Sequence, residues 1–279
     1  MAITGGSVVA FGLLEDAGVL RLHSQFDSGV NLQCLDYLVY LGTDEHGGAC
    51  ALEVEEADLE ELRSEQEWRW TGEALVATGG ARRVVLHPDA VAYPVAPPTV
   101  PGLAAGDPRR LARARASAGD HSWFDSEAGR HLGLPRLRVA VDALVHGGSE
   151  AARSVVAVVG LGAGLTPSAD DALVGALCTL AADSRPVSET ASRVEAWLRA
   201  EGGSATTDVS ASYLRLALQG AYSAPLGRLV AALADDVPDV QLIDAVRDLG
   251  EIGATSGMDA AVGVQVAWEQ LVAAGPDPL

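Results

Sequence analysis

The sequence contains no lysine, because all 19 of its basic residues are arginines. This excludes sites built on a lysine, such as a Schiff base or the lysine of a phosphate-binding P-loop. An anionic ligand must therefore be held by arginine, hydroxyl groups, backbone N–H groups or a metal ion. Basic residues are also outnumbered by 38 Asp and Glu, which gives a net charge of −19. Such a surface repels phosphate backbones and anionic lipids, so we expect neither nucleic acid nor a membrane as a partner.

Cysteines and long apolar runs are scarce as well. Three scattered cysteines, Cys34, Cys50 and Cys178, form neither a disulfide framework nor a metal-binding spacing. No apolar run reaches the ~18 residues that a membrane span needs. No basic segment precedes the short apolar run near the N-terminus, so we expect no signal peptide and a cytoplasmic location.

Short strand-like segments fill the first part of the chain. Runs rich in β-branched and aromatic residues, such as YLVYLG at 37–42, alternate with Gly, Asn and Asp turns up to about residue 98. They predict a small β-barrel or sandwich over residues 1–98. Residues 57–66 (ADLEELRSEQ) are expected to form its one helical turn.

Helical patterns dominate the rest of the chain. A stretch dense in Pro and Gly predicts a linker over residues 99–108, and residues 109–279 contain a series of capped, apolar helices. The fold class is therefore α+β, with a β-rich domain followed by a larger, mainly α-helical domain. Residues 152–160 (ARSVVAVVG) fit a buried strand and a buried helix equally well.

A glycine-rich motif, GLGAGLTPSADD at residues 160–171, precedes the most apolar of these helices. Its three glycines let the backbone turn tightly and approach a ligand. Thr166 fits the N-cap and Pro167 the first helical position. The N–H groups of the first turn, with the hydroxyls of Thr166 and Ser168, then form a cradle for an anion.

Two aspartates, Asp170 and Asp171, stand in the same first turn, where they would repel a simple anion. Either Mg²⁺ bridges carboxylates and ligand, or the ligand has an N–H-bearing end that donates to an aspartate, as in a carbamoyl or oxamoyl compound. A capped helix start with solvated acids fits the motif equally well, and Asp171 alone can face solvent, since adjacent helical residues point ~100° apart. A dinucleotide site fits less well, because Leu165 stands where the third glycine belongs.

The motif has an echo near the end of the chain. GLTPSADDALVG at 164–175 is similar to GATSGMDAAVG at 253–263, with Gly, Thr and Asp aligned without a gap and the distal glycine displaced by one. A third hydroxyl-rich helix start, TTDVS, lies at 206–210. Good helix caps alone explain such segments, but if the three starts converge, their dipoles act on one anionic ligand.

The glycine-rich segment resembles the signature G-L-G-x-G-L-T-P-S-G-D-D-F-L-x-G of the AllH family, from which it departs at Ala169 and Ala172. Segments LHSQFDSGVNL, TTDVSASYLRLALQGAYSAPLGRLV and GATSGMDAAVG are similar to other parts of that family. The resemblance implies a subunit of oxamate carbamoyltransferase from anaerobic allantoin degradation, a branch of purine catabolism. Such an enzyme exchanges a carbamoyl group between oxamate and phosphate. It works with two other subunits, one of them resembling an acyl-CoA synthetase.

We therefore predict a subunit of a carbamoyltransferase-type enzyme that binds a small amide-bearing anion at the glycine-rich helix N-terminus. The alternative is a non-catalytic anion-binding or assembly subunit of a multi-subunit enzyme. Asp170 and Asp171 are the predicted catalytic residues; no metal ligands and no cofactor are assigned, although the motif can accommodate Mg²⁺. The predicted substrate-binding residues are Asn31, Gly162, Gly164, Thr166, Ser168, Thr207, Ser210, Thr255, Ser256 and Asp259.

Other polar residues receive no assigned role. His23 follows a strand pattern and His121 lies in a predicted loop, GDHSWFDS, where a solvated histidine is the usual outcome. Four arginines in RRLARARAS (109–117) cannot share one helix face, which indicates a solvated helix. The alternative is that one of them reaches a phosphate.

Overall fold

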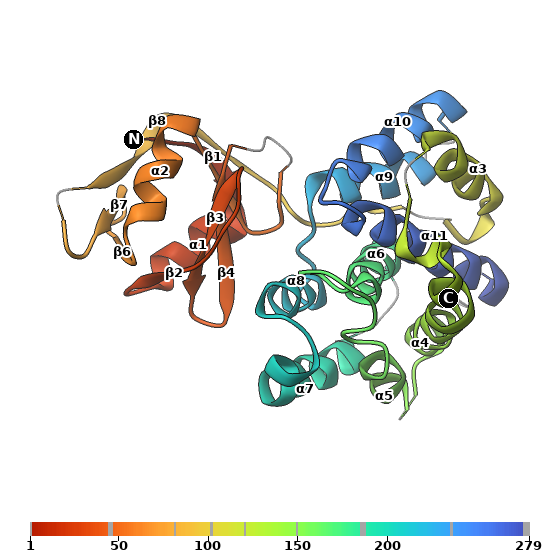
Figure 1. Cartoon of the computed structure of the whole chain (residues 1–279). Coiled ribbons are helices and arrows are strands. Elements are labelled where there is room, and N and C mark those ends of the chain that lie inside the picture. Colours follow the sequence, from red (N-terminus) through yellow and green to blue (C-terminus); the bar gives the residue numbers. More distant parts are fainter. Residues whose placement is uncertain are drawn as a thin grey trace. The chain divides into compact units, whose positions relative to one another are not determined.

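A computed structural model describes residues 2–43, 47–80, 82–100, 103–119, 121–148, 150–184, 188–234 and 237–275. The chain divides into two compact units, Met1–Val95 and Ala96–Leu279 (Figure 1). The predicted linker falls at the start of the second unit, and its residues 101 and 102 lie outside the described ranges.

The first unit is a closed eight-stranded barrel, so the predicted barrel or sandwich is a barrel. Its neighbour order is β1-β5-β4-β3-β2-β6-β7-β8, and β8 returns to pair in parallel with β1. Closure leaves no strand edge exposed, which removes the risk of pairing with other chains. The strands are β1 (Ala2–Ser7), β2 (Leu20–Gln25), β3 (Gly29–Cys34), β4 (Tyr37–Gly42), β5 (Ala51–Val54), β6 (Glu67–Trp70), β7 (Ala74–Ala77) and β8 (Arg83–Tyr93).

Two helices accompany these strands, where the sequence predicted one. The predicted turn is α2 (Glu56–Ser64), and the additional helix is α1 (Val8–Asp16). Ser7 caps α1, because its hydroxyl accepts a hydrogen bond of 3.0 Å from the N–H of Ala10. The sequence missed α1 because its residues VVAFGLL are apolar throughout and show no helical period.

The second unit is mainly helical, which confirms the predicted α+β class. Within the ambiguous stretch 152–160, residues 152–156 lie in a helix that begins at Ala151. Among the described helices, none combines the length and the hydropathy that crossing a bilayer requires. The helices are α3 (Arg109–Ala118), α4 (Leu134–His146), α5 (Ala151–Val156), α6 (Ser168–Ala182), α7 (Ser188–Ala205), α8 (Asp208–Leu218), α9 (Ala224–Ala234), α10 (Asp239–Gly250) and α11 (Ser256–Ala274), with short turns η1 (Leu103–Ala105), η2 (Trp123–Asp125) and η3 (Gly129–Gly133).

Helices α6 and α11 form the largest helix–helix contact in the described part of the chain and lie at the centre of the helical core. Most residues of both are buried, as expected of helices that are apolar on nearly all sides. The two helices run in the same direction. Thr166, just before α6, and Ser256, at the start of α11, share a hydrogen bond of 2.7 Å, and the helices are still in contact two turns later.

Two glycines make this close packing possible. A Cβ on Gly175 would lie 2.0 Å from the carbonyl oxygen of Ala260, and a Cβ on Gly263 would lie 1.8 Å from that of Ala172. No real Cβ approaches an oxygen so closely, so only glycine fits at either position. These are the distal glycines of the repeat seen in the sequence, and each one contacts the other helix.

Gly263→Ala should destabilise the protein by about 1–3 kcal/mol, because the new methyl group forces α6 and α11 apart. Urea unfolding at neutral pH measures this change. Gly227→Ala in α9 is the control: its Cβ would meet no atom closer than 3.9 Å, and alanine favours a helix over glycine by roughly 0.5–1 kcal/mol. Equal unfolding midpoints for Gly263→Ala and the unaltered protein would contradict the packing described above.

Candidate functional site

The two copies of the sequence repeat lie side by side at the starts of α6 and α11. Two parallel helices that begin together bring the positive ends of their dipoles close to each other, which is unfavourable unless negative charge lies nearby. Three aspartates in the first turns, Asp170, Asp171 and Asp259, supply that charge. We call these residues the acid cluster, and the place where α6 and α11 begin the helix junction.

The glycine turn before α6 has backbone angles and close contacts that favour glycine. Gly160, Gly162 and Gly164 all have positive φ, at 78°, 124° and 102°. A Cβ on Gly160 would lie 1.9 Å from the carbonyl oxygen of Ala205, so the turn packs closely against the end of α7. Residues 162–165 are exposed, and their N–H groups make no hydrogen bond within the described parts of the protein.

The start of α6 differs from the prediction by one residue. Pro167 is the N-cap and Ser168 the first helical residue, while the hydroxyl of Thr166 bonds to Ser256 and does not cap α6. The first turn is also satisfied internally, because Ala169 N–H donates to Leu161 O (2.9 Å) and Asp170 N–H donates to Pro167 O (2.8 Å). Contrary to the prediction, these two N–H groups are not available to a ligand.

Asp170 is 1% exposed and fully hydrogen-bonded. Its Oδ1 accepts from Gly160 N–H (2.8 Å), and its Oδ2 accepts from the hydroxyls of Thr206 (2.5 Å) and Ser210 (2.6 Å). Burial raises the pKa of this carboxyl group, while the three hydrogen bonds oppose the rise by favouring the charged form. Asp170 thereby connects the glycine turn, α6 and α8.

Asp259 is 0% exposed, but only one of its oxygens has partners. Its Oδ1 accepts from the hydroxyl of Ser122 (2.5 Å) and from Trp123 N–H (2.9 Å). The hydroxyls of Ser168 and Thr255 lie near enough to favour the charged form, while burial raises the pKa. Even so, the buried Oδ2 makes no hydrogen bond to any described residue.

Asp171 shows the same pattern. Burial raises the pKa of its carboxyl group well above the ordinary value, and the hydroxyls of Thr166 and Ser256 oppose the rise. Its Oδ2 is buried without a hydrogen-bond partner in the described structure. The residue as a whole is half-buried, but its Oδ2 is turned away from solvent, toward the start of α11 and the charge of Asp259.

The third hydroxyl-rich segment also reaches the helix junction. Thr207 is the N-cap of α8, since its Oγ1 accepts from Ser210 N–H (3.1 Å), and the same hydroxyl donates to Leu165 O (2.5 Å). Thr255 is the N-cap residue of α11 but forms no capping bond with its side chain. The structure thus brings together the starts of α6, α8 and α11, with all the predicted site residues of the helical unit.

Asn31 lies in the other unit, on β3 of the barrel. It is 3% exposed, and its Nδ2 donates to Ser24 Oγ (3.1 Å), which also contacts the ring of His23 (3.2 Å). A role for Asn31 in substrate binding stays a prediction.

The acid cluster is a poor match to the ligands of a metal ion. Across the described ranges, no three His, Cys, Asp or Glu side chains are arranged to hold a metal. Asp170 accepts N–H and O–H donors at both oxygens, and Asp259 does so at Oδ1. The oxygens left over, Oδ2 of Asp171 and of Asp259, suit two N–H donors better than they suit Mg²⁺, which prefers six oxygen ligands.

Sequence reasoning missed the segment that holds Asp259. It singled out His121, whereas the contacts come from Ser122 and Trp123. Ser122 and Asp125 form a capping box around η2, and the S-x-x-D spacing that signals this box can be read from the sequence. The sequence does not reveal that Ser122 contacts Asp259, which lies 137 residues further along the chain.

A family model described as oxamate carbamoyltransferase subunit AllH matches residues 158–268. The matched segment runs from just before the glycine turn to Trp268 in α11, so it contains the acid cluster and α8. The match confirms, over these residues, the resemblance seen in the sequence. No solved structure matches the chain.

The raised pKa of Asp171 predicts how stability changes with pH. The folded protein holds the proton of the Asp171 carboxyl group more tightly than the unfolded chain does. The stabilising contribution of this proton is therefore present below about pH 4 and is lost as pH rises through the folded-state pKa. Asp171→Asn removes the titration. Relative to the unaltered protein, this variant should gain stability with rising pH, by about 1.4 kcal/mol for each unit of pKa shift.

Urea unfolding from pH 4 to pH 8 measures the effect. Asp208→Asn, an exposed aspartate in the first turn of α8, is the matched control. A stability difference between Asp171→Asn and the unaltered protein that stays constant over this range would show that the Asp171 carboxyl is not held in an environment that disfavours its charge.

Proposed function

We propose that the chain is a subunit of a carbamoyltransferase-type enzyme and that its helix junction binds a small amide-bearing anion such as oxamate. The family match supports the first part, because that family is described as a subunit of oxamate carbamoyltransferase. The second part rests on the chemistry of the acid cluster. Residues 162–166 and 253–256 at the junction are exposed or half-exposed, whereas Asp170 and Asp259 are buried beneath them in the first turns.

One observation carries the proposal: two neighbouring carboxylates, Asp171 and Asp259, each keep a buried Oδ2 that no described group bonds. A buried acceptor without a partner costs about 1–3 kcal/mol, and native proteins rarely leave one. A primary amide carries two N–H donors on one nitrogen and satisfies two acceptors at once. The acid cluster therefore accepts the amide end of the ligand.

The anionic end of the ligand needs donors close by. The N–H groups of 162–165 are exposed and unbonded, and the hydroxyls of Thr166 and Ser256 border the junction. The positive ends of α6 and α11 add a favourable potential. The oxyanion thus binds at the glycine turn itself. Gly164 leaves room for it, since a Cβ there would meet no atom closer than 3.9 Å, whereas Gly162 is required because a Cβ would lie 2.6 Å from Ser168 N. Ser210 donates to Asp170, and Ser168 lies near Asp259.

The same geometry suits proton transfer. When oxamate accepts a carbamoyl group from carbamoyl phosphate, its amide nitrogen bonds to the carbamoyl carbon, the bond from that carbon to the phosphate oxygen breaks, and the nitrogen loses a proton. Asp171 receives the proton, because a carboxylate with a raised pKa is a better base. Asp170 positions the glycine turn through Gly160 N–H. Companion subunits, one of them resembling an acyl-CoA synthetase, complete the enzyme.

The alternative, a non-catalytic anion-binding or assembly subunit, shares the binding site but not the proton transfer. The purified chain mixed with its companion subunits separates the two. In a transferase, Asp171→Asn abolishes turnover, whereas in an assembly subunit the reconstituted enzyme keeps its activity with this variant.

Binding tests the site itself. Calorimetry should show that Asp171→Asn and Asp259→Asn weaken oxamate binding at least tenfold, because each variant replaces one carboxylate oxygen with an NH2 donor and removes the negative charge. Oxalate has no N–H donor, so its affinity should not fall in either variant. Asp244→Asn on α10, an exposed aspartate, is the matched control.

Unchanged oxamate affinity in both variants would refute the amide site. Titrations of oxamate, phosphate and carbamoyl phosphate with and without Mg²⁺ complete the design. If binding occurs only with Mg²⁺ present, the ion bridges the carboxylates and the amide interpretation is wrong.

A further inference from the structure

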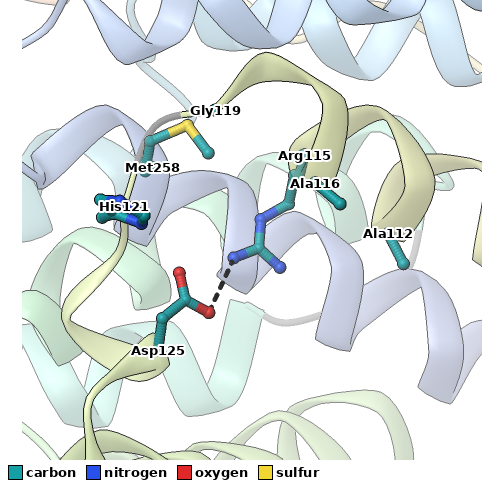
Figure 2. A pocket seen from close by; sticks show the side chains of 7 residues that line it. All are labelled: Ala112, Arg115, Ala116, Gly119, His121, Asp125 and Met258. Carbon is teal, nitrogen blue, oxygen red and sulfur yellow. Dashed lines mark ion pairs between the residues drawn. The ribbon is translucent and has the colours of Figure 1, made fainter.

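A cavity of about 270 Å³ opens beside the helix junction (Figure 2). One wall is α3, which contributes Arg115. The rest of the lining comes from Gly119, His121, Asp125 and Met258 of α11. Figure 2 shows the guanidinium of Arg115 extending across the cavity towards Asp125. The cavity is in the helical unit, and of its lining only Met258 belongs to the segment that matches the family model.

Arg115 is the feature that points to a ligand. Its side chain is only 14% exposed, yet its hydrogen-bonding capacity is partly unused. Nη1 donates to Gln265 Oε1 (2.7 Å), Nη2 lies a long 4.0 Å from Asp125 Oδ1, and Nε has no hydrogen-bond partner in the described structure. A guanidinium has five N–H donors in a planar fork that fits a carboxylate.

Asp125 places an acceptor opposite this fork. Its Oδ2 accepts from Ser122 N–H (3.0 Å), while the one contact of Oδ1 within the described ranges is the long one with Arg115. A dianion would be repelled by this carboxylate and by the nearby charges of Asp259 and Glu269. A ligand with one carboxylate and an adjacent N–H donor instead satisfies both Arg115 and Asp125.

We propose that this cavity is a second binding site, which takes a small monocarboxylate carrying an amide or amine N–H. The carboxylate bonds to Arg115, and the N–H group bonds to Asp125. The remaining lining, Ala112, Ala116 and Met258, packs against the carbon atoms of the ligand. The site goes beyond the proposed function, since it uses none of the residues assigned to the oxamate site.

The two sites share one structural element. Asp259 of the acid cluster holds Ser122 and Trp123, and Asp125 lies in the same short turn, η2. The cavity and the helix junction are therefore neighbours that contact one segment. This arrangement would let a two-substrate enzyme hold two small anions near each other.

Calorimetry with oxamate and with oxalate tests the cavity in the Asp171→Asn variant, where the junction site is disabled. We expect one remaining oxamate site. Adding Arg115→Gln should lower its affinity for oxamate at least tenfold. Adding Asp125→Asn should weaken oxamate but strengthen oxalate, because the repulsion of the second carboxylate is gone. Arg113→Gln, an exposed arginine of the same helix, should change neither affinity.

Arg115→Lys is a second variant that keeps the positive charge and so is less prone to misfold. Because it lacks the planar fork of the guanidinium, it should also weaken oxamate binding. Thermal unfolding verifies that each variant is folded. Oxamate affinity that is the same with and without Arg115→Gln overturns the proposal, as does the absence of any oxamate site once Asp171 is replaced. If instead Arg115→Gln removes all oxamate binding and Asp171→Asn none, the cavity stands and the proposed junction site fails.

Discussion

The contact between the N-terminal halves of α6 and α11 is the constraint on which the helical unit depends. Gly175 and Gly263 bring the two backbones so close that the helix starts cannot separate. Two positive dipole ends then face one region, and the buried charge of the acid cluster offsets them. Burial raises the pKa of all three carboxyl groups. The hydroxyls and N–H groups that surround them follow from this need, because a buried carboxylate is tolerated only when donors approach it.

The three acids nevertheless differ in how they are satisfied. Asp170 accepts three hydrogen bonds and joins the glycine turn to α8, so its role lies in the framework. Asp171 and Asp259 each retain an open acceptor. The framework acid and the two acids with open acceptors stand in the first turns of two contacting helices, so the fold holds these groups rigid while leaving acceptors free for a ligand. The family match spans this whole arrangement, from the glycine turn to α11.

Much of the secondary structure could be predicted from the sequence, because alternating strands, caps and helical periods are local signals. Helix α1 was not predicted, because its apolar run VVAFGLL shows no helical hydrophobic period. The repeat revealed two similar helix starts, but not that they touch, because that contact depends on Gly175 meeting Ala260 far along the chain. Whether Asp171 faced solvent could not be decided either, since the answer depends on where α11 packs. The sequence suggested that one arginine of 109–117 could reach an anion; only the fold singles out Arg115, with Asp125 opposite.

A crystal structure of the protein grown with saturating oxamate addresses the central claim most directly. The account predicts the amide nitrogen about 2.7–3.2 Å from Oδ2 of both Asp171 and Asp259, with the carboxylate over the N–H groups of 162–165. A junction closed by a direct hydrogen bond between the two aspartates, or filled with ordered water while oxamate is bound elsewhere, would contradict it.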